Sequence, residues 1–130
     1  MTPLRALVIS ARAGLENLSP TELAAELARG DAVVVDVREP AEVARGTLPG
    51  AVAVPRGLLE FLADGVEARG HPDLRPGRRL VLCSAAGDRS ALAAAALQAL
   101  GRTDVAHLAG GLRAWTAEGR PLRRAGAQEP

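Results

Sequence analysis

Residues 80–90 carry the residue types and the spacing that best support chemistry in this chain. An apolar run with strand character ends at Cys83, the only cysteine, and a loop containing Gly87 leads to Arg89 at the start of an alanine-rich helix. Successive backbone N–H groups in such a turn can point into one concavity, where the helix N-terminus adds partial positive charge. An anion can bind there, and a thiol at that point would ionise near neutral pH. Cys83 and Ser84 both compete for the position at the centre of the loop.

The composition excludes several other kinds of site. All 16 basic residues are arginine, which excludes Schiff-base chemistry and a P-loop lysine. A single cysteine excludes an internal disulfide and a zinc site built from several thiolates. One tryptophan, one phenylalanine and no tyrosine cannot form a stacking platform for single-stranded nucleic acid. The formal net charge of +1 gives no reason to expect a polyanionic partner.

Length and hydropathy predict one folded domain. The chain has 130 residues, of which 48% are apolar, and it contains no low-complexity tract. No stretch approaches the roughly 20 apolar residues that a membrane span needs. The apolar patch at residues 6–9 is too short for the core of a signal peptide. We therefore expect a cytoplasmic protein without membrane contact.

Strands alternate with helices along the chain, which predicts a parallel sheet covered on both faces. Residues 1–15 have no strong pattern, and residues 4–9 are expected to add an edge strand or to pack loosely. A capping box at Ser19 and Glu22 begins a helix that Gly30 ends. The remaining predicted strands are residues 32–37, 51–54, 80–83 and 105–108. The remaining predicted helices are residues 41–45, 58–69, 90–100 and a last one between Gly111 and Gly119, with a surface loop at residues 70–77.

Three blocks of this sequence together resemble a single-domain rhodanese. They are VDVREPAE at 35–42 with GTLPGA at 46–51, LVLCSAAGDRSA at 80–91, and GGLRAW at 110–115 with Gly119 and Pro121. The resemblance implies a rhodanese-like three-layer α/β sandwich, with a central, mostly parallel sheet of about five strands flanked by helices. It covers residues 16–122, which leaves residues 1–15 as an N-terminal extension and residues 123–130 as a flexible tail.

Proteins of the rhodanese family take a sulfane sulfur from thiosulfate or a persulfide donor onto a cysteine, and they pass the sulfur to a thiophilic acceptor. The resemblance implies that Arg89 and the backbone amides of the loop hold the anionic donor. The substrate-binding residues implied in this way are Ser84, Ala85, Ala86, Gly87, Asp88 and Ser90. It also implies that Asp36, Arg38 and Trp115 are structural, and Thr47 stands where the family usually has histidine.

The position of the nucleophile departs from the family's pattern. We align this loop with the family's active-site loop from Arg89 backwards and without a gap. The position of the family's cysteine then falls on Ser84, and Cys83 lies one residue earlier. Strand side chains alternate between faces, so this offset should turn the thiol away from the loop. A serine cannot carry a persulfide. The gapless alignment therefore predicts a non-catalytic module that binds an anion or a partner protein.

A loop that is one residue longer would restore Cys83 as its first residue, with five residues before Arg89. That spacing is found in dual-specificity phosphatases and some arsenate reductases, and Asp88 could then donate a proton. Leu82, however, replaces the histidine that such phosphatases place before their cysteine. The leading hypothesis is sulfur transfer with Cys83 and Arg89 as catalytic residues, with the non-catalytic module and the phosphatase or reductase as alternatives.

The expected partners are a small anionic sulfur donor, a thiol acceptor and a protein that accepts sulfur. No cofactor or metal is expected, because the two histidines have no metal-ligand spacing. His71 is predicted to be a loop residue and His107 a residue at the sheet edge. Neither nucleic acid nor a membrane is an expected partner, and the oligomeric state is not predicted.

Overall fold

The protein is built around a five-stranded parallel sheet. The computed structural model describes residues 1–64 and 71–124. The strands lie in the order β1-β5-β4-β2-β3, and each neighbouring pair is parallel. They are β1 (Glu16–Leu18), β2 (Val33–Asp36), β3 (Val52–Ala53), β4 (Leu80–Cys83) and β5 (Val105–Leu108). This agrees with the predicted sheet.

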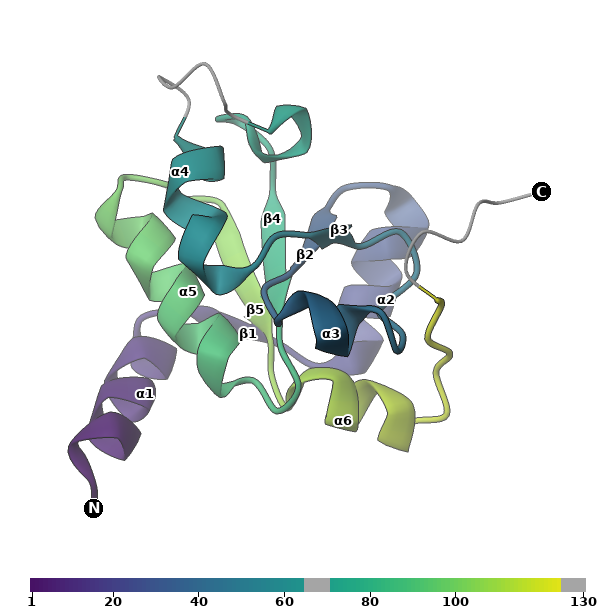
Figure 1. Cartoon of the computed structure of the whole chain (residues 1–130), viewed down its shortest axis with the longest axis horizontal. Coiled ribbons are helices and arrows are strands. Elements are labelled where there is room, and N and C mark those ends of the chain that lie inside the picture. Colours follow the sequence, from purple (N-terminus) through teal and green to yellow (C-terminus); the bar gives the residue numbers. More distant parts are fainter. Residues whose placement is uncertain (65–70, 125–130) are drawn as a thin grey trace.

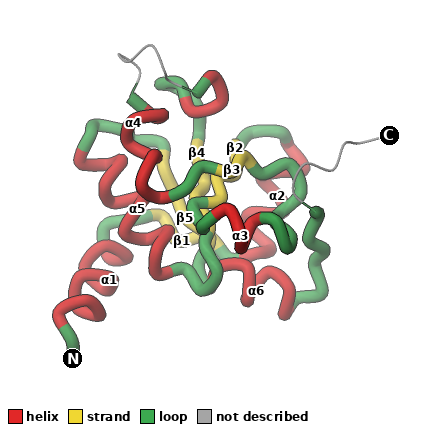
Figure 2. Tube along the Cα trace, in the orientation of Figure 1, coloured by secondary structure: helices red, strands yellow, loops and turns green. Residues whose placement is uncertain are grey.

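Helices cover both faces of the sheet and complete the predicted three-layer sandwich (Figures 1 and 2). The helices are α1 (Pro3–Ala13), α2 (Pro20–Arg29), α3 (Pro40–Val43), α4 (Leu59–Ala63), α5 (Asp88–Ala99) and α6 (Gly111–Ala117), with short 3₁₀ turns at Arg56–Leu58 and Pro72–Leu74. Residues of α4 and α5 form one apolar layer with the sheet, and residues of α2 and α6 form the other. None of the helices in the described part of the chain is long and apolar enough to cross a membrane.

The side chains of β4 divide between the two layers. Leu80 and Leu82 pack with the α4/α5 layer, whereas Val81 and Cys83 pack with the α2/α6 layer. All four residues are fully buried. This alternation follows from the two-residue period of a strand and fixes the direction of each side chain up to the end of β4.

The predicted start and end of α2 are confirmed. Ser19 caps the helix in a reciprocal capping box with Glu22, and Gly30 ends it with a left-handed backbone, φ +74°. A glycine is favoured at such a position because it has no Cβ to clash with the following carbonyl.

The N-terminal segment differs from the prediction of an edge strand or loose packing. Thr2 caps α1, and Pro3 occupies its first turn. Apolar residues at Leu4, Val8 and Ala11 follow at helical spacing, and α1 packs against α5. The edge strand next to β5 is formed instead by the three residues of β1, which the sequence pattern did not reveal.

The helix predicted over residues 58–69 is shorter in the structure. It ends at Ala63, because Asp64 has an extended backbone. The predicted inward position of Val66 lies outside the described residues. The predicted loop at 70–77 contains a 3₁₀ turn, which places Leu74 in the α4/α5 layer.

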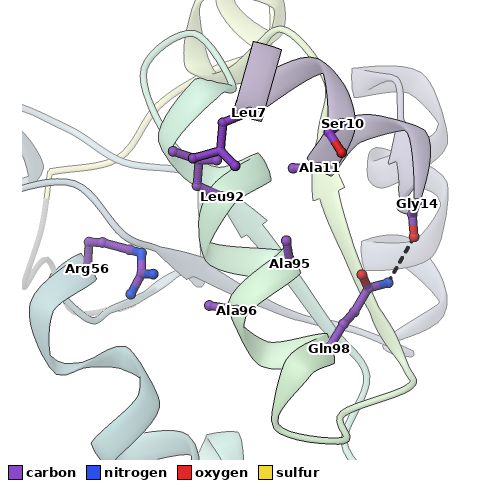
Figure 3. A pocket seen from close by; sticks show the side chains of 9 residues that line it. All are labelled: Leu7, Ser10, Ala11, Gly14, Arg56, Leu92, Ala95, Ala96 and Gln98. Carbon is purple, nitrogen blue, oxygen red and sulfur yellow. Dashed lines mark hydrogen bonds between the residues drawn. The ribbon is translucent and has the colours of Figure 1, made fainter. Parts of the chain in front are cut away.

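A hollow of about 560 Å³ lies between α1, α5 and the turn at Arg56 (Figure 3). Two of its four lining side chains on α5 are small, because alanines occupy positions 95 and 96. At one end of the hollow, Gln98 Nε2 donates a hydrogen bond of 3.1 Å to the carbonyl oxygen of Gly14. The alanine-rich sequence of α5 thus leaves space on the side where α1 packs.

The N-terminus of α6 is bonded directly to the segment that follows β4. The N–H groups of Leu112 and Arg113 donate to the carbonyl oxygens of Ser84 and Ala85, at 2.9 and 3.0 Å. This close approach requires Gly111, where a Cβ would overlap both carbonyl groups, and whose φ of +62° also favours glycine.

Replacing Gly111 with alanine is expected to destabilise the fold more than replacing Gly119. At Gly119, φ is also positive, +77°, but no heavy atom lies within 4 Å of an added Cβ. Gly119→Ala should therefore cost about 1–2 kcal/mol for backbone strain alone. Gly111→Ala should cost about 1–3 kcal/mol more, because α6 must move away from the loop. Urea unfolding followed by circular dichroism measures the free energy of unfolding of both variants. Equal losses of this free energy would contradict this account of Gly111.

Candidate functional site

The segment from Ser84 to Arg89 connects the carboxyl end of β4 to the first turn of α5. Gly87 adopts φ +97°, and an added Cβ there would lie 3.1 Å from the backbone nitrogen of Gly110. The chain reverses at this glycine, as its place in the loop predicted. The turn lies at the carboxyl edge of the parallel sheet, where ligands bind in open α/β folds.

Cys83 lies in the α2/α6 layer. Its side chain packs with the apolar cluster that includes Leu23 and Leu112, and it has no solvent exposure. Burial raises the pKa of the thiol well above its usual value, and the nearby Asp36 carboxylate raises it further, although Arg38 opposes this. In this geometry, Cys83 is the last strand residue and does not form part of the turn.

Ser84 is the first residue of the turn. Its hydroxyl oxygen accepts a hydrogen bond of 3.1 Å from the backbone N–H of Ser90, in the first turn of α5. Ser84 is fully buried at this point. The position of the family's cysteine in the gapless alignment therefore holds a hydroxyl group, whose oxygen lies against the start of α5.

The backbone N–H groups of residues 85–89 are open donors. No acceptor for any of them lies among residues 1–64 and 71–124. The next N–H group, that of Ser90, is the one bonded to Ser84. Because α5 has 12 residues, its N-terminus adds partial positive charge at the same place. The turn can therefore donate several hydrogen bonds to an oxyanion.

Arg89 is held by a carboxylate from α3. Its two terminal nitrogens donate to the two oxygens of Glu42, at 2.7 and 2.9 Å. The guanidinium holds the pKa of Glu42 down at about 2, from its ordinary 4.5. Both side chains remain partly exposed, so the guanidinium can still be reached from solvent.

Asp36, Arg38 and Thr47 form a buried polar cluster near the end of β2. Arg38 donates side-chain hydrogen bonds to both oxygens of Asp36, at distances from 2.8 to 3.1 Å. Thr47 Oγ1 donates to the same carboxylate at 2.7 Å. Arg38 also reaches the carbonyl oxygen of Gly46 at 2.6 Å and so ties the following loop to the sheet. Thr47 thus contributes its hydroxyl where the family usually has histidine.

His107 lies inside the protein, and its predicted place at the sheet edge is wrong. It belongs to β5, which lies between β1 and β4, and it is fully buried. Its Nε2 lies 2.7 Å from Asn17 Oδ1, and its Nδ1 lies 3.0 Å from the Ser90 hydroxyl oxygen. Sequence reasoning missed this because the short strand β1, which carries Asn17, has no recognisable pattern.

The hydrogen bonds of Asn17 determine which ring nitrogen of His107 is protonated. Asn17 Nδ2 donates to the carbonyl oxygens of Arg12 and Leu15, so its Oδ1 must face the imidazole as an acceptor. The hydrogen of a neutral His107 is therefore on Nε2, and Nδ1 faces the Ser90 hydroxyl as an acceptor, beside the carbonyl oxygen of Gly87, which lies 3.2 Å from the same hydroxyl. Burial and, to a lesser extent, the charge of Arg12 together lower the pKa of His107 to about 4.

The other residues that the sequence singled out have structural contacts. Trp115 is buried in the α2/α6 layer and donates from Nε1 to the carbonyl oxygen of Pro121 at 2.8 Å. His71 accepts a hydrogen bond from the N–H of Asp73 at the start of a 3₁₀ turn. Over the described parts of the chain, no cluster of His, Cys, Asp and Glu side chains could hold a metal ion.

The neutral state of His107 predicts a pH dependence of stability. Between the ordinary pKa of 6.5 and the native value of about 4, the unfolded chain binds a proton that the native protein does not. The free energy of unfolding should therefore fall as the pH is lowered through this range, by at most about 1.4 kcal/mol per pH unit. Urea unfolding between neutral and acidic pH should give a flatter profile for His107→Gln than for the wild type. His71→Gln is the control and should keep the wild-type slope, and equal slopes in all three proteins would refute the assignment.

The Rhodanese-like domain family matches residues 19–118 of the chain. The chain is 33% identical over 92 residues to a sulfurtransferase of Allochromatium vinosum, a match that covers 71% of this chain and 78% of that protein. It is also 33% identical over 106 residues to the probable adenylyltransferase/sulfurtransferase MoeZ of Mycobacterium tuberculosis. That match covers 81% of this chain but only 26% of the longer protein.

Solved structures agree with the sequence relatives. A Rhodopseudomonas palustris protein described as a possible tyrosine phosphatase of unknown function superposes with a TM-score of 0.86 at 35% identity, and the match covers 95% of this chain and 96% of that one. The human single-domain sulfurtransferase TSTD1 superposes with a TM-score of 0.69 at 31% identity, over 81% of this chain and 98% of that one. The sheet order, the turn at the end of β4 and these matches agree, and the chain belongs to the rhodanese-like family of sulfurtransferases.

Proposed function

We propose that this protein is a rhodanese-homology module that binds an oxyanion at the 84–89 segment and does not carry sulfur on Cys83. The observation that supports this most directly is the order of two side chains at the end of β4. Cys83 packs into the apolar α2/α6 layer, and the hydroxyl of Ser84 takes the first position of the turn.

Sulfur transfer needs a thiolate that a donor can reach. The thiol of Cys83 packs among the apolar side chains of the α2/α6 layer instead of lying in the turn, and burial raises its pKa, so it is not ionised near neutral pH. Ser84 cannot replace it, because a persulfide requires sulfur. Within residues 1–64 and 71–124, its hydroxyl has a hydrogen bond only with the backbone N–H of Ser90, and no general base contacts it.

Anion binding needs only the groups that the turn provides. The N–H groups of residues 85–89 supply hydrogen-bond donors, and Arg89 supplies a positive charge beside them. Ser84 adds a hydroxyl whose oxygen already accepts from Ser90, so its proton can be donated to a ligand. A tetrahedral or thiosulfate-like oxyanion matches this set of donors.

Sulfur transfer through Cys83 is the second candidate. The relatives named as sulfurtransferases support it, as do Gly87, Arg89 and the closing sequence block around Trp115. It requires β4 to end one residue earlier, with the thiol rotated out of the α2/α6 layer. A phosphatase using Cys83 and Arg89 needs the same rearrangement, and the Rhodopseudomonas palustris protein described as a possible tyrosine phosphatase is the comparison that would favour it.

Anion binding and sulfur transfer predict opposite effects on activity for substitutions of Cys83 and Ser84. In a thiosulfate-to-cyanide assay, the wild type and Cys83→Ala should both be inactive. Ser84→Cys should gain activity, because its sulfur would take the first position of the turn, against the N-terminus of α5. Intact-mass measurement after thiosulfate treatment should find one added sulfur atom in Ser84→Cys and none in the wild type.

A double substitution identifies the sulfur that reacts. Cys83→Ala combined with Ser84→Cys should keep the gained activity, because only the residue in the turn contacts the donor. Wild-type activity that Cys83→Ala abolishes would reject the proposal in favour of sulfur transfer. Hydrolysis of a phosphate ester that Cys83→Ala abolishes would favour the phosphatase.

The affinity for an anion should change when the carboxylate that holds Arg89 is removed. Glu42→Gln should strengthen phosphate or thiosulfate binding about threefold to tenfold, because a negative charge beside the site is removed and the guanidinium is released. Arg89→Gln should weaken binding by at least a similar factor. The matched control is Glu60→Gln, which removes a carboxylate from the partly exposed pair with Arg56 and should leave the affinity unchanged. Isothermal titration calorimetry measures the anion affinity of the wild type and the three variants. Equal affinities in all four proteins would mean that the anion binds elsewhere.

A further inference from the structure

The hollow between α1, α5 and the turn at Arg56 is an open groove with a low floor. Helix α1 forms one wall through Leu7, and Arg56 projects from the opposite side (Figure 3). The floor is α5, where Leu92, Ala95 and Ala96 follow the i, i+3, i+4 spacing of a helix face that packs against another element. No element among residues 1–64 and 71–124 fills the space over this face.

An apolar ridge formed by Leu4 and Leu7 stands beside this hollow. The two leucines lie one turn apart on α1, and they are 63% and 58% exposed. Of the eight large apolar residues that are exposed in the described part of the chain, four lie within residues 1–9. Contiguous apolar surface of this kind is typical of an interface, because covering it removes it from water. The ridge and the hollow therefore form one apolar surface with a raised half and a sunken half.

This surface carries no unbalanced charge. Among the described residues that line the hollow, only Arg56 is charged, and it is paired with Glu60 at 2.6 Å. The two arginines of α1 do not line the hollow, since Arg5 and Arg12 both lie beside the carboxylate of Asp88, at 3.7 and 3.3 Å. A strongly acidic or basic partner finds no complementary charge here, whereas a second copy of the same neutral surface meets no repulsion.

A ridge beside a hollow is also the shape that a two-fold dimer requires, because each copy must supply both halves of the contact. We propose that two copies of this chain associate through α1 and α5, with Leu7 of each copy lying in the hollow of the other copy against Ala95 and Ala96. Leu7 lies near the middle of α1 (Pro3–Ala13), so a two-fold axis beside it brings the same part of both helices together. The two α1 helices then run antiparallel, and the positive N-terminus of each lies near the C-terminal end of the other. This inference does not depend on the proposed anion-binding function.

Sedimentation equilibrium of the full chain measures the association. The wild type should shift from the 13.4 kDa of one chain to twice that mass as its concentration rises through the micromolar range. Leu7→Glu should raise the dissociation constant of the dimer about thirtyfold or more, because a carboxylate would be buried in the apolar hollow of the other copy. The matched control is Leu100→Glu, since Leu100 is 57% exposed just after α5 but does not line the hollow. It should keep the wild-type dissociation constant.

A pair of complementary variants tests whether the occupant of the hollow is a second copy. Ala95→Arg alone should weaken the association, because its side chain fills the place that receives Leu7. An equimolar mixture of Leu7→Glu and Ala95→Arg should recover the dimer. In the mixed dimer, one contact joins the new carboxylate to the new guanidinium, and the other contact keeps the wild-type residues. Native mass spectrometry separates the mixed dimer from both homodimers, and it should be the most abundant of the three.

Four outcomes would overturn the proposal. They are a wild type that stays monomeric over this concentration range, a dimer that Leu7→Glu leaves intact, equal weakening by Leu7→Glu and Leu100→Glu, and a mixture that forms no more dimer than its two components. Circular dichroism of each variant separates loss of association from loss of the fold. Leu7→Ser removes apolar surface from the ridge without adding a charge, and it should weaken the dimer in the same direction.

Discussion

The two-residue alternation of side chains along β4 determines what the site can do. Val81 and Cys83 face one layer and Leu82 the other, because Val81 and Leu82 are paired with both β2 and β5, and Cys83 is paired with β2, in a buried sheet. A strand enclosed on both faces cannot slip by one residue without moving every side chain to the opposite layer. The residue that follows Cys83 therefore begins the turn, and in this sequence that residue is a serine.

The turn is held in place from three directions. The N-terminus of α6 donates hydrogen bonds to the carbonyl groups of Ser84 and Ala85. Glu42 on α3 holds the guanidinium of Arg89. His107 in β5 contacts the hydroxyl of Ser90. These contacts use carbonyl oxygens and side chains and leave the N–H groups of residues 85–89 free, so the fold orders the turn without occupying its donors.

Much of the fold could be predicted from the sequence, because the signals were local. The capping box at Ser19 and Glu22 and the turn at Gly87 follow from residue type and spacing. The helix α1 and the strand β1 could not be predicted in this way, since α5 and β5 stabilise them through contacts distant in sequence. For the same reason, the partners of His107 were missed. The sequence identified both Cys83 and Ser84 as candidates, and only the packing of β4 separates them.

The bonds of Asn17 connect the N-terminal extension to the turn. Asn17 accepts from His107 and donates to the carbonyl of Arg12 at the end of α1, and His107 in turn contacts Ser90. Arg12 itself contacts Asp88 from the other side. Undocking of α1 would therefore weaken two separate supports of the same turn. The amide hydrogen-exchange rates of residues 85–89 thus depend on how firmly the first helix is seated, although those residues lie far from it along the chain.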